Sequence, residues 1–463
     1  MNPNDHRAAL ADIQVTAQDV KFSTIVCFLA WTFAVYDFVL FANLLPVIAQ
    51  DLGWTAAQTT GINTWVTIGT ALVAFFVGPL VVDRMGRKSG IVIAVTGAAL
   101  ASGLTFVAGW MVGALGVLGL VLLILIRSLA GLGYAEQSIN ATYLNEMFSH
   151  VDRKNGGGAS RGFIYSLVQS GWPVGSVIAA ASIAILQPLG GWELCFIVGV
   201  FPAFIMMALG KKLKESPQFR ARQLVTQWRS QGHTAEAEQL AREYHIGEET
   251  GVSPLKAAFS GESLRPTLTL SAAMLMNWLG ILAFAFQGTL VLTSGKQVNF
   301  NDALTILIIS NATGFLGYLF HGWLGDRIGR RNTIALGWFL AAFAFAGMLW
   351  APNGSYGLVV ALYSVGLFFL IGPYSALLFF NAESFPVETR ATAGSFINAL
   401  GQVGAILGGV LFTIHLSGLT QESAAELISS TWINAALIWG TVPILLSAAL
   451  MLLARDVRPG RQS

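Results

Sequence analysis

The sequence predicts an all-α membrane protein with twelve transmembrane helices in two halves of six and both termini in the cytoplasm. Its 463 residues are 54% hydrophobic and only 11% charged, whereas a soluble domain carries about 25% charged residues. Twelve apolar segments are long enough to cross a bilayer. Lys and Arg residues gather on one side of these segments, and that side is expected to be cytoplasmic.

The twelve expected spans follow one another with mostly short connections. A helix needs about 20 apolar residues to cross the hydrocarbon core. The expected spans are 22–49, 61–82, 89–109, 116–146, 162–187, 192–212, 266–294, 302–325, 332–351, 356–383, 391–416 and 430–454.

The orientation follows from the basic residues. With both termini inside, Lys296 is the lysine or arginine expected outside, Arg127 falls within a span, and the others of the 26 lie on the cytoplasmic side. The polar start of the chain does not resemble a cleaved signal peptide, so the first apolar segment is expected to remain as a span.

The chain divides at one long hydrophilic stretch. We expect a cytoplasmic N-terminal segment, a first six-helix half, a linker with short amphipathic helices, a second six-helix half and a cytoplasmic tail. These regions are 1–21, 22–212, 213–265, 266–454 and 455–463.

Composition and motifs argue against several other classes of protein. The net charge of +2 gives no electrostatic footprint for nucleic acid. Cys27 and Cys195 both fall in apolar runs, so neither a disulfide framework nor a metal site is expected. No phosphate loop, hydrolase triad or zinc spacing occurs. We therefore expect no enzyme, cofactor or metal.

A short motif occurs once in each half. Asp-Arg-x-Gly-Arg spans 83–87 after the second expected span, and the same pattern spans 326–330 after the eighth, which is the second span of the later half. Two copies at equivalent positions indicate parallel halves. In transporters built from such halves, the substrate site lies between them near the midplane.

These residues resemble the major facilitator superfamily over almost the whole chain. The loop motif, run on to Lys88, is the family's most recognisable signature. The stretch 214–220 (KESPQFR) is similar to an element of the sugar-porter branch, with Lys214 in place of its first proline, and 382–392 is similar to the corresponding element after the tenth span. The stretches 36–41 and 131–136 resemble proton symporters of organic acids, including the sialate/lactate and aromatic-acid groups.

Asp37 and Arg127 are expected to meet inside the membrane. Asp37 lies about 24 Å beyond Lys21, and Arg127 about 28 Å before Glu146, at 1.5 Å per helical residue. Pairing lowers the cost of keeping either charge in lipid. The resemblance implies the same, since proton-coupled relatives carry an Asp and an Arg at these positions. Protonation of Asp37 would break the pair and release Arg127, unless the pair only aligns the two spans.

Glu136 is a second candidate proton site. It follows Arg127 by nine residues, about half a turn out of phase on a helix, so a direct pair between them is not expected. A buried carboxylate without a cation takes up a proton readily, although a hydrogen-bonded structural role fits as well. Asp37, Glu136 and Arg127 together carry one negative charge, and two protons would make the site suit a monoanion.

Further polar and aromatic side chains fall near the middle of the expected spans. The resemblance places ligand contacts around Gln169 and in the seventh span, whereas Trp and Tyr in spans also serve in packing and at interfaces. The substrate-binding candidates are Tyr36, Arg127, Tyr134, Asn140, Gln169, Trp172, Asn277, Gln287, Tyr374, Asn398 and Gln402.

Charged residues at the cytoplasmic ends of the spans form a candidate gate. Opposite charges on the two halves would close the cytoplasmic side and separate when it opens; the arginines also anchor the topology. These residues are Asp83, Arg84, Arg87, Glu146, Arg161, Asp326, Arg327, Arg330, Glu383 and Arg390.

The sequence therefore predicts a multi-pass transporter of the inner (plasma) membrane that imports a small organic acid with protons by alternating access. Its expected partners are a small-molecule substrate, protons and lipid, without nucleic acid, and we expect a monomer. A neutral sugar or polyol symporter using the same Asp37–Arg127 pair, a proton-driven exporter and a non-transporting membrane sensor are the alternatives.

Overall fold

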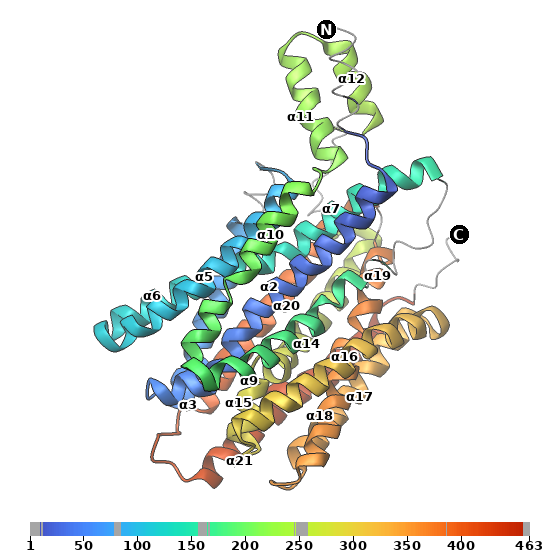
Figure 1. The fold of residues 1–463 in the computed structure, drawn as a ribbon. Helices are drawn as coiled ribbons and strands as arrows, with labels where there is room; N and C mark the ends of the chain where they lie inside the picture. The colour runs from blue at the N-terminus through green and yellow to red at the C-terminus, as the bar shows by residue number, and fades with distance from the viewer. Residues whose placement is uncertain are drawn as a thin grey trace.

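The computed structural model describes residues 10, 13–77, 85–155, 164, 167–244, 246, 258–385 and 387–456; the side chains of 77, 138, 149–155, 378, 382 and 387–391 are not described. All regular secondary structure in the described part of the chain is helical (Figure 1). The elements of the first half and linker are α2 (Ala17–Asp51), α3 (Ala56–Leu72), η1 (Val73–Val77), α5 (Arg87–Leu115), α6 (Val117–Ser128), α7 (Gly131–Asn155), α9 (Gly171–Val198), α10 (Phe201–Lys212), α11 (Pro217–Ser230) and α12 (Thr234–Glu243).

The later part of the chain has the same character. Here η marks short 3-10 or π-helical segments. The elements are η2 (Gly261–Ser263), α14 (Leu264–Ile281), η3 (Leu282–Phe286), α15 (Gly288–Leu290), η4 (Val291–Gly295), α16 (Phe300–Ile328), α17 (Arg330–Trp350), α18 (Tyr356–Ile371), α19 (Tyr374–Glu383), α20 (Val387–His415), α21 (Ala425–Ala436), η5 (Leu437–Thr441) and α22 (Val442–Leu453).

Local sequence signals start the first two long helices. Thr16 caps α2 by accepting from the backbone N–H of Asp19, whose carboxylate accepts from the N–H of Thr16 at 2.9 Å. Thr55 and Gln58 form the same reciprocal capping box at the start of α3. Each box satisfies backbone donors that a helix start leaves free, so both helices begin directly after their capping threonine.

Eleven helical stretches in the described residues are long and apolar enough to cross a membrane. One of them, Leu167–Lys212, has 46 residues and would be about 69 Å long if straight, twice the thickness of a bilayer core. Its helix leaves helical geometry at Gly190 and Gly191, where Gly191 has a φ of 70°. Only glycine adopts that conformation at little cost, so the chain turns here.

The fourth expected span, 116–146, differs from an unbroken helix. It consists of α6 and α7, which are separated at Leu129 and Ala130. Gly131 follows this break, and a Cβ there would lie 2.3 Å from the backbone oxygen of Thr70. The small residue therefore allows α7 to start directly against α3.

The helices pack into one bundle with a small helical hairpin at one end (Figure 1). The hairpin, α11 and α12, projects beyond the end where α2 begins; we name this the hairpin end. The starts of α3 and α21 and the short α15 lie at the opposite, far end. Across the two halves, α3 packs on α20, α9 on α16 and α2 on α15.

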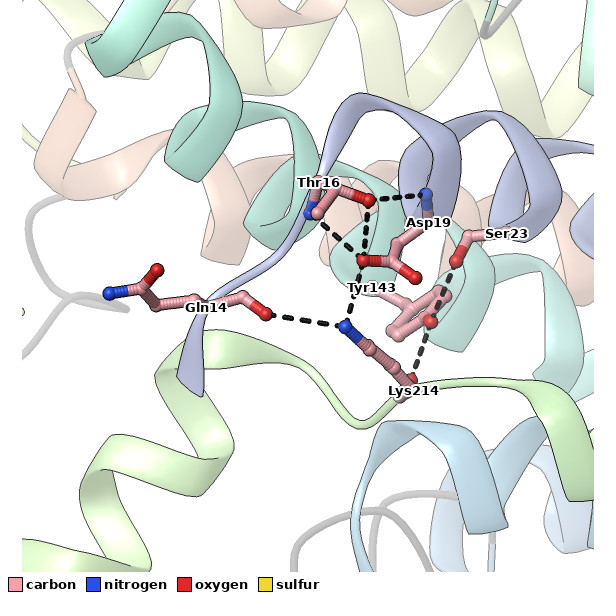
Figure 2. A network of polar contacts seen from close by, with 6 residues as sticks. All are labelled: Gln14, Thr16, Asp19, Ser23, Tyr143 and Lys214. Atoms are coloured by element: carbon pink, nitrogen blue, oxygen red, sulfur yellow. Dashed lines mark hydrogen bonds and ion pairs between the residues drawn. The ribbon is translucent and has the colours of Figure 1, made fainter. Parts of the chain in front are cut away.

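The hairpin is tied to the first half by a polar network (Figure 2). Lys214, just before α11, forms an ion pair with Asp19 at 2.9 Å, while its carbonyl accepts from the Tyr143 hydroxyl at 2.7 Å. Tyr143 also shares a hydrogen bond with Ser23. Ile13, ahead of α2, is buried against the hairpin, so the start of the chain and the linker pack together.

Candidate functional site

Asp37 and Arg127 form an ion pair in the middle of the bundle. Asp37 is 2% exposed and Arg127 is 1% exposed, and their charged atoms are 3.3 Å apart. The Arg127 guanidinium also donates to the backbone oxygen of Asp37 at 3.1 Å and to the Thr105 hydroxyl at 3.5 Å. α2 and α6 thus bring together two charges that are 90 residues apart in sequence.

The Arg127 side chain lies in a small cavity, which we name the Arg127 chamber. Its guanidinium carbon is 5.1 Å from the centre of the Phe41 ring and 5.6 Å from that of Phe196. Aromatic faces attract a cation while they exclude water. The chamber is lined by Phe38, Phe41, Ala42, Asn63, Val66, Thr67, Thr70, Arg127, Ala130 and Phe286.

Glu136 lies apart from this ion pair. It is fully buried on α7, and no described residue forms an ion pair with it or donates a hydrogen bond of normal geometry to its carboxylate. The Asn140 amide lies beside it and donates to the backbone oxygen of Cys27 at 2.9 Å. Glu136 and Arg127 therefore occupy separate sites.

Several substrate-binding candidates meet at a second cavity between the halves, which we name the aromatic cavity. Six of its ten lining residues carry aromatic rings, and two carry amides that hydrogen-bond to each other at 2.9 Å. Its volume is about 50 Å³. The lining residues are Trp31, Tyr134, Gln137, Gln169, Trp172, Trp278, Ile281, Tyr318, Ile371 and Tyr374.

Two further candidates adjoin this cavity without lining it. Asn277 accepts a hydrogen bond from the Tyr374 hydroxyl at 2.7 Å, and Gln402 lies beside the Tyr134 hydroxyl. The second of these contacts joins α20 of the later half to α7 of the first. The amides of both halves thus surround the same cluster of phenol and indole rings.

The remaining candidates lie elsewhere. Tyr36 is 3.5 Å from Ser182, Asn140 is buried beside Glu136, and Asn398 is exposed on α20. Gln287 is buried where the helix breaks between η3 and α15, and no described residue hydrogen-bonds to its amide. None of these four lines the aromatic cavity.

The residues around these two cavities that the sequence does not single out include Trp31, Phe38, Gln137, Trp278, Phe286 and Tyr318. The ring centres of Phe38 and Phe286 are 4.8 Å apart, and the rings meet edge to face. These two rings lie between the Arg127 chamber and the rings of the aromatic cavity. One signal was available, because Trp31 and Phe38 are seven residues apart, within about 20° on one helix face. An aromatic stripe alone, however, does not distinguish a cavity from packing.

A third cavity lies at the far end, and we name it the far cavity. It has a volume of about 400 Å³, within the range of small-molecule pockets. All of its lining residues are uncharged: Pro46, Val47, Ala49, Gln50, Trp54, Thr55, Ala56, Thr59, Leu290, Thr293, Ser294, Val298, Phe300, Leu419, Thr420, Gln421, Ile428 and Trp432.

The candidate gate residues at the hairpin end pair within each half. Arg87 contacts Glu146 at 3.2 Å in the first half, and Arg330 contacts Glu383 at 2.7 Å and Asp326 at 3.7 Å in the second. The Arg327 guanidinium lies over the Trp323 ring. Asp83, Arg84, Arg161 and the side chain of Arg390 lie outside the described residues.

The part of the chain that is described contains no candidate metal-binding site. No group of three or more His, Cys, Asp or Glu side chains is arranged to hold an ion there. The described cysteines, Cys27 and Cys195, are free and buried. What the arrangement offers is a buried ion pair, a separate buried carboxylate and a cavity of rings and amides.

Comparison with known proteins identifies the family. The model of the Major Facilitator Superfamily matches residues 24–409. The chain belongs to this superfamily. It is 26% identical to the niacin transporter NiaP of Acinetobacter baylyi over 83% of this chain and 84% of that protein. It is 27% identical to the 4-hydroxybenzoate transporter PcaK of Pseudomonas aeruginosa, over 83% of each chain.

A further relative and a solved structure agree with this assignment. The gallate transporter of Pseudomonas putida is 26% identical over 84% of this chain and 83% of its own length. The inward-open xylose transporter XylE of Escherichia coli superposes with a TM-score of 0.64 at 17% identity, covering 96% of this chain and 98% of that one. The predicted fold family is therefore confirmed, and the chain is a membrane transporter of the superfamily rather than an enzyme.

Proposed function

We propose that this transporter imports a small organic acid together with protons, by alternating access of two six-helix halves. We count twelve spans, because the stretch Leu167–Lys212 turns back at Gly190 and Gly191 and therefore crosses the membrane twice. The hairpin end carries the clustered Arg and Lys residues and is then cytoplasmic, together with both termini. The relatives are bacterial, which supports the inner membrane as the location.

The observation that carries this proposal is the buried Asp37–Arg127 pair. Two charges at this depth are stable only while each compensates the other. A proton on Asp37 removes its charge, so the Arg127 guanidinium loses its counter-ion and can bind another anion. A carboxylate substrate supplies that anion, which couples uptake of the proton to uptake of the acid.

The aromatic cavity supports an aromatic carboxylic acid as the substrate. Rings such as those of Trp172 and Tyr134 stack on a planar ligand, and the amides of Gln137 and Gln169 offer hydrogen bonds to its polar substituents. Relatives named for niacin, gallate and 4-hydroxybenzoate favour the same class. The present volume of about 50 Å³ means that the cavity must widen to bind such a molecule.

Glu136 is proposed as a second proton-binding group. It lies beside the Asn140 amide in a fully buried position, where an uncompensated negative charge is costly. One proton then neutralises the sum of Asp37, Arg127 and Glu136, and a second leaves one positive charge for a monoanion. Stoichiometry above one proton per anion follows only if both carboxylates are used.

The cytoplasmic charges are proposed to act as a gate. Arg87, Glu146, Arg330 and Glu383 pair within their own halves, as they would while the cytoplasmic side is open. In the opposite state, the same charges and those outside the described residues would pair across the halves. We propose a monomer as the working unit, since each chain supplies both halves.

Proton movement into proteoliposomes tests the proposal. Purified protein is reconstituted, and internal acidification is followed while aromatic acids, other monocarboxylates, sugar acids and neutral sugars are added in turn. Acid-specific proton uptake that is lost in Asp37→Asn, while exchange of labelled acid continues, is the expected result. Proton uptake with neutral sugars alone would assign a sugar symporter, and undiminished coupling in Asp37→Asn would transfer the role to Glu136.

A further inference from the structure

The three cavities follow one another along two helices that face each other across the halves. On α2, Trp31 lines the aromatic cavity, Phe41 the Arg127 chamber and Gln50 the far cavity. Because α2 rises 1.5 Å per residue, these positions span about 29 Å. The cavities are therefore stacked along the direction in which a substrate must cross the membrane.

The opposing wall repeats this order. It is the run of segments from α14 to η4, in which Trp278 lines the aromatic cavity, Phe286 the Arg127 chamber and Thr293 the far cavity. Both walls run from the hairpin end to the far end. Two independent segments thus define the same sequence of cavities.

Two contacts between the halves divide this path. The Phe38 and Phe286 rings, whose centres are 4.8 Å apart, separate the aromatic cavity from the Arg127 chamber. The Thr289 hydroxyl donates to the backbone oxygen of Ala42 at 3.2 Å, where the far cavity gives way to the chamber. Each partition needs one residue from each half, so relative motion of the halves opens either of them.

A polar face of α3 joins the far cavity to the chamber. Thr59 lines the far cavity, and Asn63, Thr67 and Thr70 line the chamber. These four positions fall within about 80° on the helix and extend over about 16 Å. A Thr hydroxyl can satisfy itself on its own helix, as Thr67 does on the carbonyl of Asn63 at 2.8 Å, so the face remains stable when it is buried.

α20 packs against α3 beside this face, at the seam between the halves. Thr413 donates to the Thr60 hydroxyl at 3.1 Å. Gly409 lies so close to α3 that a Cβ there would be 2.3 Å from the Thr64 hydroxyl oxygen. The seam therefore depends on the absence of a side chain at Gly409.

We propose that the far cavity is an external binding site for the organic anion. From it the anion and its proton reach the Asp37–Arg127 pair along the polar face of α3. The route opens when α20 separates from α3 and the Thr289–Ala42 contact breaks, before Phe38 and Phe286 part. This inference rests on the proposed alternating-access function. It assigns the first encounter with the substrate to the far cavity and the next to the Arg127 chamber, ahead of the aromatic cavity.

Charge and size support this order. The uncharged lining of the far cavity offers hydroxyls and amides without an acid that would repel an anion. Its volume of about 400 Å³ is large enough for a ring with a carboxylate. Arg127 is the next cation on the path, so the electrostatic attraction increases inward once Asp37 is protonated.

Thiol accessibility tests the route without requiring a known substrate. Cys27 and Cys195 are buried and are replaced by alanine, and a single cysteine is introduced as Asn63→Cys. Right-side-out vesicles are treated with a membrane-impermeant, negatively charged methanethiosulfonate. Gly409→Leu is added to force the α3–α20 seam apart, and Gly418→Leu is the matched control, because nothing lies within 4 Å of a Cβ at Gly418.

We expect labelling of the introduced cysteine about tenfold faster with Gly409→Leu than with Gly418→Leu, as a shift in population toward the outward-open state requires. A cysteine at position 169 (Gln169→Cys) should instead be labelled from the cytoplasmic side, and Gly409→Leu should slow that reaction. Equal external rates at position 63 in the two leucine variants, or labelling only from the cytoplasmic side, would overturn the proposal.

A second variant covers the case in which Gly409→Leu does not fold. Thr289→Val keeps the side-chain shape and removes the hydrogen bond to Ala42, so external labelling at position 63 should again accelerate, by about threefold. If Thr289→Val does not accelerate external labelling at position 63, that result counts against the route. Because labelling needs neither substrate nor proton gradient, a positive result with no acid-dependent proton uptake would reject the proposed symport while retaining the pathway.

Discussion

The first half and the second half differ in what they bury. The first half encloses the charged residues Asp37, Arg127 and Glu136, each no more than 2% exposed. The second half encloses the amides Asn277, Gln287 and Gln402, each no more than 4% exposed. In the proposed mechanism, the first half therefore supplies the proton-binding carboxylates and the Arg127 cation for the substrate's carboxylate, whereas these amides of the second half offer neutral hydrogen-bonding groups.

Their first spans differ in regularity as well. α2 is one continuous helix of 35 residues. The corresponding span of the second half changes from α14 through the π-helical η3 to α15 and the π-helical η4. π-helical turns are rare and often mark functional sites. A regular helix holds the ion pair in place, and the irregular one carries Phe286 and Thr289, which divide the path.

The largest expected effect comes from removing the cation of the first half. Arg127→Gln leaves Asp37 buried without its partner, and such a change typically costs about 3–5 kcal/mol. Protein that survives purification should have a markedly lower unfolding temperature in detergent and no acid-driven proton uptake.

The double variant Asp37→Asn/Arg127→Gln separates charge from packing. Because both charges are removed together, it should regain most of the lost stability and still fail to couple protons to transport. If the single and double variants unfold at the same temperature, an unpaired Asp37 carboxylate costs no stability at this position, and the contrast between the halves is weaker than proposed.

A smaller effect is expected from the pairs at the hairpin end. Glu146 accepts from Arg87 and from the Ser216 hydroxyl, and its side chain is 8% exposed, against 26% for Glu383 in the second half. Hydrogen bonds to a buried charge contribute about 1.5–3 kcal/mol, and exposed pairs below about 1 kcal/mol. Glu146→Gln should therefore lower the unfolding temperature more than Glu383→Gln; equal shifts would contradict this reasoning.

On the substrate side, Tyr374→Phe removes one hydroxyl from the aromatic cavity. Its hydrogen bond to Asn277 is worth about 1 kcal/mol, so the amide loses its orientation while the protein stays folded. We expect a several-fold rise in the KM for the acid with an unchanged ratio of protons to substrate. A changed ratio would show that the second half takes part in coupling.

Much of this organisation was accessible from the sequence. The all-helical transporter fold is confirmed, because long apolar segments have few alternatives. The depths of Asp37 and Arg127 followed from helical rise, and the two residues do lie in contact. Their role in coupling remains a prediction. A charged residue within an apolar span is a strong signal of a polar site, because placing a charge in lipid costs a large free energy.

Other features were not accessible. The break between α6 and α7 depends on packing of Gly131 against Thr70, which is a contact between distant segments. Trp31, Trp278 and Tyr318 line a cavity, yet an aromatic residue has the same sequence pattern in a cavity, a core or a lipid-facing surface. A polar residue within a span is ambiguous too, because it fits a binding site, a structural hydrogen bond or a surface position equally well. Asn140 and Asn398 are examples, since neither lines the aromatic cavity.

The smallest effect concerns the lysine that the second half buries at its far end. Lys296 lies between η4 and α16, outside the spans, and is 1% exposed. Its ammonium donates to the backbone oxygens of Leu349, at 3.2 Å, and Ala351. Burial lowers the pKa of this lysine below its ordinary value of 10.5, because the charged form loses hydration.

The sign of the resulting pH dependence follows from proton binding. The unfolded chain holds the proton of Lys296 more tightly than the folded protein, so stability rises as the pH increases from the lowered folded pKa toward 10.5. Lys296→Met should abolish that rise in the unfolding temperature, measured in detergent over this alkaline range. Lys212→Met, at an exposed position at the end of α10, controls for the loss of a positive charge. Parallel curves for wild type and Lys296→Met would mean that Lys296 is solvated in the folded protein, so that the second half buries no cation at its far end.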